Sequence, residues 1–224
     1  MLDQLIINNV GSLDEYGASV ALRTIKAPAK KEIKETVPFS NQAYDFSAIN
    51  GEVYWEEREL EFVLELTADT PEGLERKKSR LANWLMNVQA ARIFDPHDLD
   101  HYFLGTYSDM TFEDDESVEY TVCTVVFKAY PYKIAVKPTT IVLTVLPEGP
   151  YTGVLHVDSG HRVVPTVTCS TAVTIEKAGV SYVFPAGAAR SNNFKLNPGP
   201  NVLTISNDTG EEVTVTVSFF EEVF

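Results

Sequence analysis

Apolar and polar residues alternate along most of the chain, which is the pattern of half-buried β-strands. In segment 59–68 (ELEFVLELTA) the leucines and Phe62 fall on one face and the glutamates on the other. Segment 117–132 alternates in the same way until Pro131 interrupts it. After residue 135, short runs rich in Val and Thr are separated by Gly, Pro, Asn or Asp, and we find no helical period. This second part is predicted to be an antiparallel β-sandwich.

One segment, 71–91, has the period of an amphipathic helix. Thr70 suits the N-cap, Pro71 the first helical position, and Glu72 the positive end of the helix dipole. Apolar residues then recur every three or four positions, and we expect this stripe to pack against a sheet. The predicted protein is therefore mainly β: an N-terminal domain resembling a β-barrel or β-sandwich with one helix at 71–91, and a C-terminal antiparallel β-sandwich.

Charge and composition change at the same point of the chain. The whole sequence has 18 Lys and Arg against 32 Asp and Glu, a net charge of −14. Residues 1–135 carry 13 basic and 24 acidic residues, a net of −11, and residues 136–224 carry 5 and 8, a net of −3. We therefore predict two domains, 1–135 and 136–224, with the boundary between Lys133 and Pro147. Such acidity argues against specific nucleic-acid binding and against binding to an anionic membrane surface.

The two cysteines, Cys123 and Cys169, lie in apolar β-branched runs and fit no metal-binding spacing. We expect buried, reduced thiols from a reducing cytoplasm, with a disulfide as the minor alternative. The start of the chain, MLDQLIINN, is unlike a signal peptide, and no apolar run approaches the roughly 18 residues that span a bilayer. A soluble protein without membrane insertion is expected.

The candidate chemical clusters favour loops over sites. Segment 95–101 (DPHDLDH) has two imidazoles and three carboxylates that could hold a divalent ion, but its spacing matches no metal motif, so a structural loop is expected. The acidic segment 113–119 lacks the periodicity of a calcium loop and indicates a turn between strands. We also expect 156–161 to be a solvated loop and the basic run 26–35 to be an exposed segment. With no hydrolase, phosphate-binding or zinc motif, no catalytic residue, metal or cofactor is predicted.

The order of several weak motifs carries a resemblance across almost the whole chain. The most specific are YFLGTY (102–107) and AYPYK (129–133). The others are VPFSNQAYDFS, VYWEERELEF, NWLMNVQAARIFDP, GVLHVDSGHRVVPTVT and FKLNPGPNVLTISND. Together they resemble the distal tail protein family, in its short form, of long flexible-tailed bacteriophages and related prophages.

The resemblance implies a structural role in the virion, without enzymatic activity. Domain 1–135 would form a hexameric ring at the distal end of the tail tube, and the sandwich 136–224, which resembles a galectin or carbohydrate-binding module, would project outward. The ring would connect the tail tube protein to tail-tip, baseplate and host-binding proteins, and DNA would pass through its lumen. The protein would be made in the bacterial host cytoplasm and reside at the virion tail tip.

A closed ring needs one surface of a protomer to meet a different surface of its neighbour. Segment 30–58 is dense in aromatic and apolar residues that could serve as interface anchors or as core. The predicted interface residues are Val37, Phe39, Tyr44, Phe46, Tyr54, Trp55 and Arg58. Arg58, beside Glu57, is expected to form a charge pair across or within protomers.

The acidity has a place in such a ring, because carboxylates facing the lumen would repel DNA phosphates. The candidates are the acidic segment with Glu113, Asp114, Asp115 and Glu116, or the glutamate face of 56–65. Charge that serves only solubility is the open alternative.

Two other classes of function remain open from the sequence. The first is a carbohydrate-binding module for host recognition, for which the second domain offers Tyr151, Tyr182, Phe184 and Phe194, although strand spacing favours the core for most of them. The second is a tail-associated hydrolase, for which the sequence provides no constrained pair of carboxylates.

Overall fold

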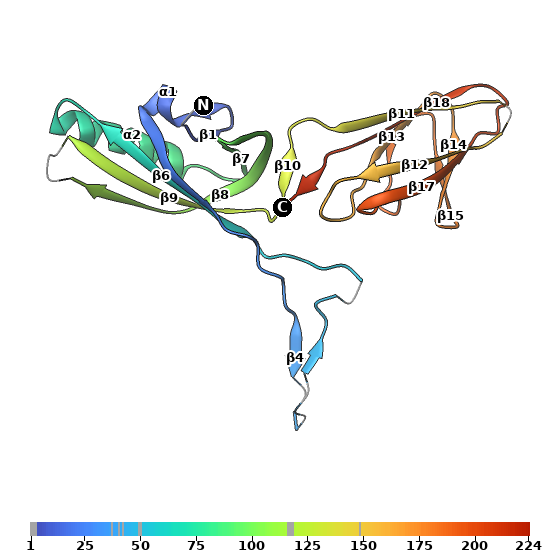
Figure 1. Ribbon diagram of the computed structural model, residues 1–224, viewed down its shortest axis with the longest axis horizontal. Helices are drawn as coiled ribbons and strands as arrows, with labels where there is room; N and C mark the ends of the chain where they lie inside the picture. Colours follow the sequence, from blue (N-terminus) through green and yellow to red (C-terminus); the bar gives the residue numbers. More distant parts are fainter. Residues whose placement is uncertain are drawn as a thin grey trace. The chain divides into compact units, whose positions relative to one another are not determined.

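The computed structural model describes residues 4–36, 38, 39, 41, 43–48, 51–115, 119–147 and 149–224. The chain divides into two compact units, Met1–Lys133 and Ile134–Phe224. Strands form most of both units, and one long helix lies in the first (Figure 1). The prediction of a mainly β protein is confirmed.

The first unit is built on an antiparallel sheet with the strand order β2-β1-β7-β8-β9-β6-β3. Its elements are β1 (Ile6–Ile7), β2 (Val10–Gly11), α1 (Ser12–Tyr16), β3 (Ala18–Ile25), β4 (Lys34–Thr36), β5 (Ala43–Asp45), β6 (Arg58–Thr67), α2 (Pro71–Met86), β7 (Ala91–Asp95), β8 (Asp98–Asp114) and β9 (Tyr120–Ala129). Glu113 and Asp114, which were predicted to lie in an acidic turn, belong to β8. Segment 95–101, which was predicted to be a loop, contains the end of β7, a two-residue turn and the start of β8.

The core of the first unit lies between the sheet and α2. Alternation along β6 directs its leucines and Phe62 to this side, where Phe62 meets Phe127 of β9 edge to face at 6.3 Å. Leu74, Leu81 and Leu85 of α2 are buried against these strands. Each fully buried side chain of this kind stabilises the fold by about 1.5–3 kcal/mol. The packing of α2 on the sheet therefore stabilises both elements.

Helix α2 begins as predicted but ends earlier. The Thr70 side chain accepts a hydrogen bond from the Gly73 N–H at 3.1 Å, so it caps the first turn. The helix ends at Met86, where 91 was predicted. The Val88 N–H bonds back only three residues, to the Leu85 carbonyl at 3.1 Å, and Ala90 has a φ of +44°. These conformations turn the chain into β7, an ending that the continuing apolar period did not reveal.

Residues 26–57 join β3 to β6 and contain the small hairpin β4–β5, which is a separate two-stranded sheet. In Figure 1 it is the blue and cyan pair of strands that continues from β3 and β6. Lys34 pairs with Asp45 and Thr36 with Ala43. Every residue of these two strands is exposed, so the hairpin lies outside the core of the unit.

The second unit is an antiparallel β-sandwich, as predicted. Its sheets have the orders β11-β18-β13-β16 and β12-β17-β14-β15. The sandwich strands are β11 (Thr139–Val145), β12 (Tyr151–Val157), β13 (Thr166–Cys169), β14 (Val173–Lys177), β15 (Val180–Phe184), β16 (Gly187–Arg190), β17 (Gly199–Ser206) and β18 (Val213–Phe219). Two short strands, β10 (Lys133–Ala135) and β19 (Glu222–Val223), lie outside these sheets and pair with each other. Alternating valines and isoleucines from both sheets fill the space between them.

Candidate functional site

One face of the first unit's sheet, opposite α2, is acidic. We call it the acidic face and define it by Glu59, Glu61, Glu65, Asp109 and Glu113. Glu113 pairs with Val122, which pairs with Glu65, and Asp109 pairs with Val126, which pairs with Glu61. Directly paired residues of neighbouring strands point to the same side of a sheet, so β6 and β8 present their carboxylates together. The two alternatives of the sequence prediction, the acidic segment and the glutamate strand, meet here through Glu113.

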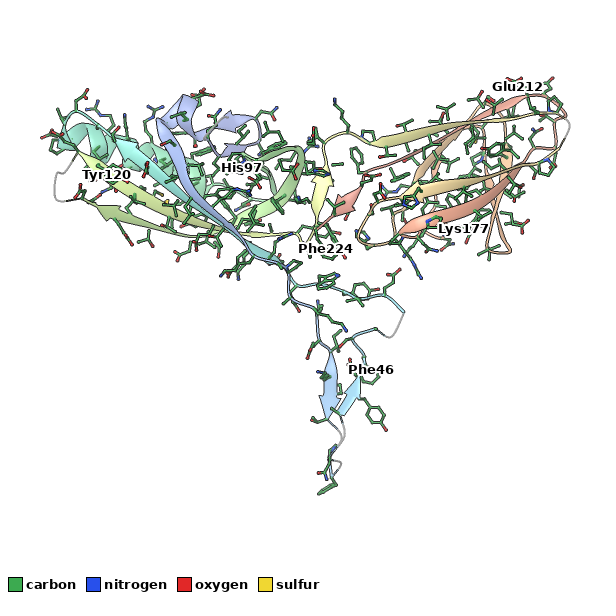
Figure 2. The ribbon with its side chains drawn as sticks, viewed as in Figure 1. Phe46, His97, Tyr120, Lys177, Glu212 and Phe224 are labelled. Carbon is green, nitrogen blue, oxygen red and sulfur yellow. The ribbon has the colours of Figure 1, made fainter. Side chains whose placement is uncertain are left out.

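Basic and phenolic groups balance only part of this charge. Lys26 donates to Glu59 at 2.5 Å, and this bond lowers the pKa of Glu59, with a smaller contribution from Lys128. Tyr120, at the start of β9 (Figure 2), donates its hydroxyl to Glu65 at 2.9 Å, which raises the pKa of Tyr120. Exposed ion pairs of this kind contribute little to stability, because water screens them. The remaining carboxylates give the face a negative potential.

The other predicted lumen residues do not share the direction of Glu113. Asp114 follows it on the strand and points to the other side, where it accepts from Lys78 of α2 at 2.9 Å. This bond lowers the pKa of Asp114, and Lys78 also contacts Glu75 at 2.8 Å. Asp115 is exposed in the turn. Glu116 lies outside the described residues.

Aromatic side chains stand exposed on the hairpin. Phe39 is fully exposed, with a φ of +67°, and Tyr44 is 62% exposed. Tyr44 stacks on Phe46 at a ring distance of 6.3 Å, and Phe46, labelled in Figure 2, is itself 38% exposed. The structure thus places these three predicted interface residues at the surface. Val37 lies outside the described residues.

Tyr54 and Trp55 lie where the hairpin segment returns to the sheet. The Lys31 N–H donates to the Tyr54 carbonyl at 2.8 Å, and Lys30 and Trp55 form an isolated bridge. Tyr54 is 44% exposed and Trp55 is half-buried. Both are accessible to a neighbouring molecule, Tyr54 more so than Trp55.

Arg58 is inside the first unit, which corrects the expectation of a charge pair. It is 7% exposed, and its guanidinium donates to the carbonyls of Lys26 at 2.9 Å and Pro131 at 3.1 Å. Its cation also lies 5.2 Å from the ring centre of Phe103. Burial lowers its pKa from the ordinary arginine value. The bonds tie β6 to the chain after β9, a contact invisible in a sequence where Arg58 follows two glutamates.

The histidines and carboxylates of segment 95–101, considered above as a metal site, form ion pairs and hydrogen bonds within the first unit. In the β7–β8 hairpin, Asp95 pairs with Arg23, while Asp98 contacts His101 at 2.9 Å and Lys133 at 2.8 Å. Among the described residues, no group of three or more His, Cys, Asp or Glu side chains could hold a metal ion.

The cysteines are buried free thiols, one in each unit, as the sequence predicted. Burial raises the pKa of Cys123 to about 12 and also raises that of Cys169. Neither environment favours the thiolate that a nucleophile or a metal ligand requires.

The aromatic candidates for sugar binding in the second unit are mostly core, as their strand spacing predicted. Phe184 and Phe194 are buried, and their rings meet at 5.3 Å. Tyr182 contacts Phe194 at 5.0 Å, whereas Tyr151 is 37% exposed. The sequence reasoning missed a pocket in this unit, lined by Arg162 and Arg190 among others. Its residues come from segments far apart in the chain, so no local pattern marks it.

The two-unit, mainly β fold, with its helix-backed sheet and short sandwich, has a match among solved structures. The structure of SPP1 Dit (gp 19.1), described as a paradigm of the hub adsorption apparatus in phages that infect Gram-positive bacteria, matches with a TM-score of 0.68. The match covers 97% of this chain and 98% of that chain at 14% sequence identity.

The other comparisons add little. A de novo designed double-stranded β-helix aligns with 36% of this chain at a TM-score of 0.28, which is too low for any argument. No protein-family model and no curated protein matches the sequence. In the described residues, no helix is long and apolar enough to cross a membrane.

Proposed function

We propose that the protein is a structural component of a phage tail hub, whose first units assemble into a hexameric ring at the distal end of the tail tube. The ring joins the tube protein to tail-tip and host-binding proteins at the virion tail tip, and DNA passes through it. The observation that carries the proposal is the agreement in fold with SPP1 Dit over almost the full length of both chains. The role is structural rather than enzymatic.

The acidic face is an argument for a channel through which DNA passes. Carboxylates of β6 and β8 share one side of the sheet, and the apolar core and α2 occupy the other. A ring that turns this face inward has a negative lumen, which repels phosphates and lets DNA slide without binding.

The edges of the sheet support ring closure. Among the described residues, β3 pairs only with β6, and residues 109–114 of β8 pair with β9 but not with β7. Unpaired edges invite a further strand. Pairing β3 of one protomer with the outer part of β8 of the next joins two different surfaces, as a cyclic assembly requires. It also continues the acidic face from one protomer to the next.

The hairpin supplies a second contact. A folded chain gains nothing from exposing Phe39, Tyr44 and Phe46 to water, and exposed aromatic residues are the typical anchors of interfaces. We place them against the neighbouring protomer, with Tyr54 and Trp55 at the margin of the contact.

Light scattering and negative-stain microscopy of the purified chain test the proposal. The expected result is a particle of six protomers with a central hole, at concentrations where the mass no longer changes. The disrupting variant is Leu22→Lys, which places a charge in the middle of β3. It should yield monomers, and its circular dichroism should match that of the original chain. A chain that stays monomeric at high concentration, alone and with its tube protein, contradicts the proposal.

A further inference from the structure

A pocket of about 310 Å³ lies in the second unit and is lined only by residues of that unit. Its walls come from segment 161–164, Thr166 of β13, the edge strand β16, the end of β18 with the residues that follow it, and Pro138 before β11. Binding in this pocket would involve the second unit alone and is independent of ring assembly.

The pocket concentrates positive charge in an acidic protein. Both Arg162 and Arg190 line it and are exposed. The pKa of Lys177, labelled in Figure 2, is lowered mainly by burial. The positive charge of Arg162 lowers it further. The basic residues of 136–224 are five: Lys137, Arg162, Lys177, Arg190 and Lys195. Two of the five, Arg162 and Arg190, line the pocket, although the chain has a net charge of −14.

Hydroxyl groups continue from the guanidinium of Arg190 across the sheet. Arg190 pairs with Thr166, and Thr166 pairs with Ser218, so the three side chains form one row on the outer side. Thr140 extends the row, with its Oγ1 3.3 Å from the Oγ of Ser218. Arginine and hydroxyl groups in a row are the donors that a carboxylate or phosphate accepts from.

His161 and Glu222 also line the pocket and contact each other. The Nε2 of His161 is 2.6 Å from a carboxylate oxygen of Glu222, and its Nδ1 is 2.7 Å from the Arg162 carbonyl oxygen. The backbone of Glu222 is held as well, because its N–H donates to the Ser159 hydroxyl at 2.9 Å. Among the described lining residues, two arginines stand against one carboxylate, Glu222, and His161 contacts that carboxylate.

The rim offers apolar surface beside these donors. Phe220 is 48% exposed, and Pro138 stands near it in the lining. An exposed ring next to guanidinium and hydroxyl groups suits the C–H face of a sugar whose charged substituent enters the pocket. We propose that this pocket binds a carboxylate or phosphate group carried by a saccharide.

Binding of the full-length chain to four polymers tests the proposal: poly(glycerol phosphate), polygalacturonate, neutral dextran and poly-glutamate. We expect one of the first two to bind, which identifies phosphate or carboxylate as the group, and neither dextran nor poly-glutamate to bind. Raising the salt from 50 to 500 mM should weaken the binding because ion pairs with exposed groups are screened. Arg162→Gln and Arg190→Gln should each raise the Kd about tenfold, the loss of one charge-assisted contact.

Arg76→Gln is the matched control, since Arg76 is an exposed arginine of α2 in the first unit. It should leave the Kd unchanged, and circular dichroism should show all three variants folded. No binding to either anionic saccharide overturns the proposal, as does equal binding to dextran or poly-glutamate. Binding that salt weakens but both arginine variants leave unchanged overturns it too, because the charge responsible then lies elsewhere.

Discussion

Glu65 of β6 and Glu113 of β8 flank the same residue, Val122 of β9, and so point to one side of the sheet. They are 48 positions apart in the sequence, and each belongs to a separate acidic segment. The two acidic segments therefore form one surface, and this surface is the proposed wall of the DNA channel.

Removing charge from the acidic face should slow DNA passage. In a phage carrying Glu61→Gln, Asp109→Asn and Glu113→Gln, we expect slower DNA ejection at unchanged virion yield, because phosphates no longer meet a repelling wall. Time-resolved release of DNA from purified virions measures the effect. The control removes three exposed carboxylates from the second unit: Glu176→Gln, Glu211→Gln and Glu212→Gln. Equal ejection rates in both variants would show that the acidity serves solubility alone.

The hairpin aromatics should matter for assembly and little for folding. Tyr44→Ser with Phe46→Ser removes a stacked, exposed pair, so the free energy of unfolding of the monomer should change by less than about 0.5 kcal/mol. The mass measured by light scattering should fall toward that of a monomer. Val154→Ser with Val183→Ser, two exposed positions of the sandwich, is the control and should leave the mass unchanged. Intact rings in the hairpin variant would remove these residues from the interface.

Arg58 should behave as a folding residue. Arg58→Gln leaves the carbonyls of Lys26 and of the buried Pro131 without their donor, so we expect a loss of about 3 kcal/mol in the free energy of unfolding. Both tryptophans, Trp55 and Trp84, belong to the first unit, so their fluorescence in a urea titration reports its unfolding. Unchanged stability combined with lost assembly would instead return Arg58 to the interface.

Burial of Cys123 should make the first unit less stable at high pH. Its pKa is raised from 9.0 to about 12, so the unfolded chain releases the thiol proton first as pH increases. The free energy of unfolding is therefore unaffected by this thiol below pH 9. Above pH 9 it falls by about 1.4 kcal/mol per pH unit because of the thiol. Urea titrations followed by tryptophan fluorescence from pH 8 to 10.5 should show a shallower decline in Cys123→Ala than in the original chain. Cys169→Ala, in the other unit, should follow the original chain, and equal slopes in all three proteins would contradict the assignment.

The sequence revealed the features that depend on local periodicity. Alternation in 59–68 identified a strand, its core face and its glutamate face, and Thr70 with Pro71 located the start of α2. Features that depend on pairing between distant segments stayed hidden. The meeting of Glu65 and Glu113 requires the register of two strand pairs, and the neighbourhood of Arg162 and Arg190 requires the sandwich to be folded. Arg58 misled because a charged residue after two glutamates has the local pattern of a surface position.

A cryo-electron microscopy reconstruction of the assembled ring tests the central claim most directly. The account predicts six protomers whose β3, β6, β9 and β8 form a continuous wall around the channel, with Glu61, Glu65 and Glu113 facing its axis and α2 outside. A ring in which α2 lines the channel and the acidic face points outward would contradict it.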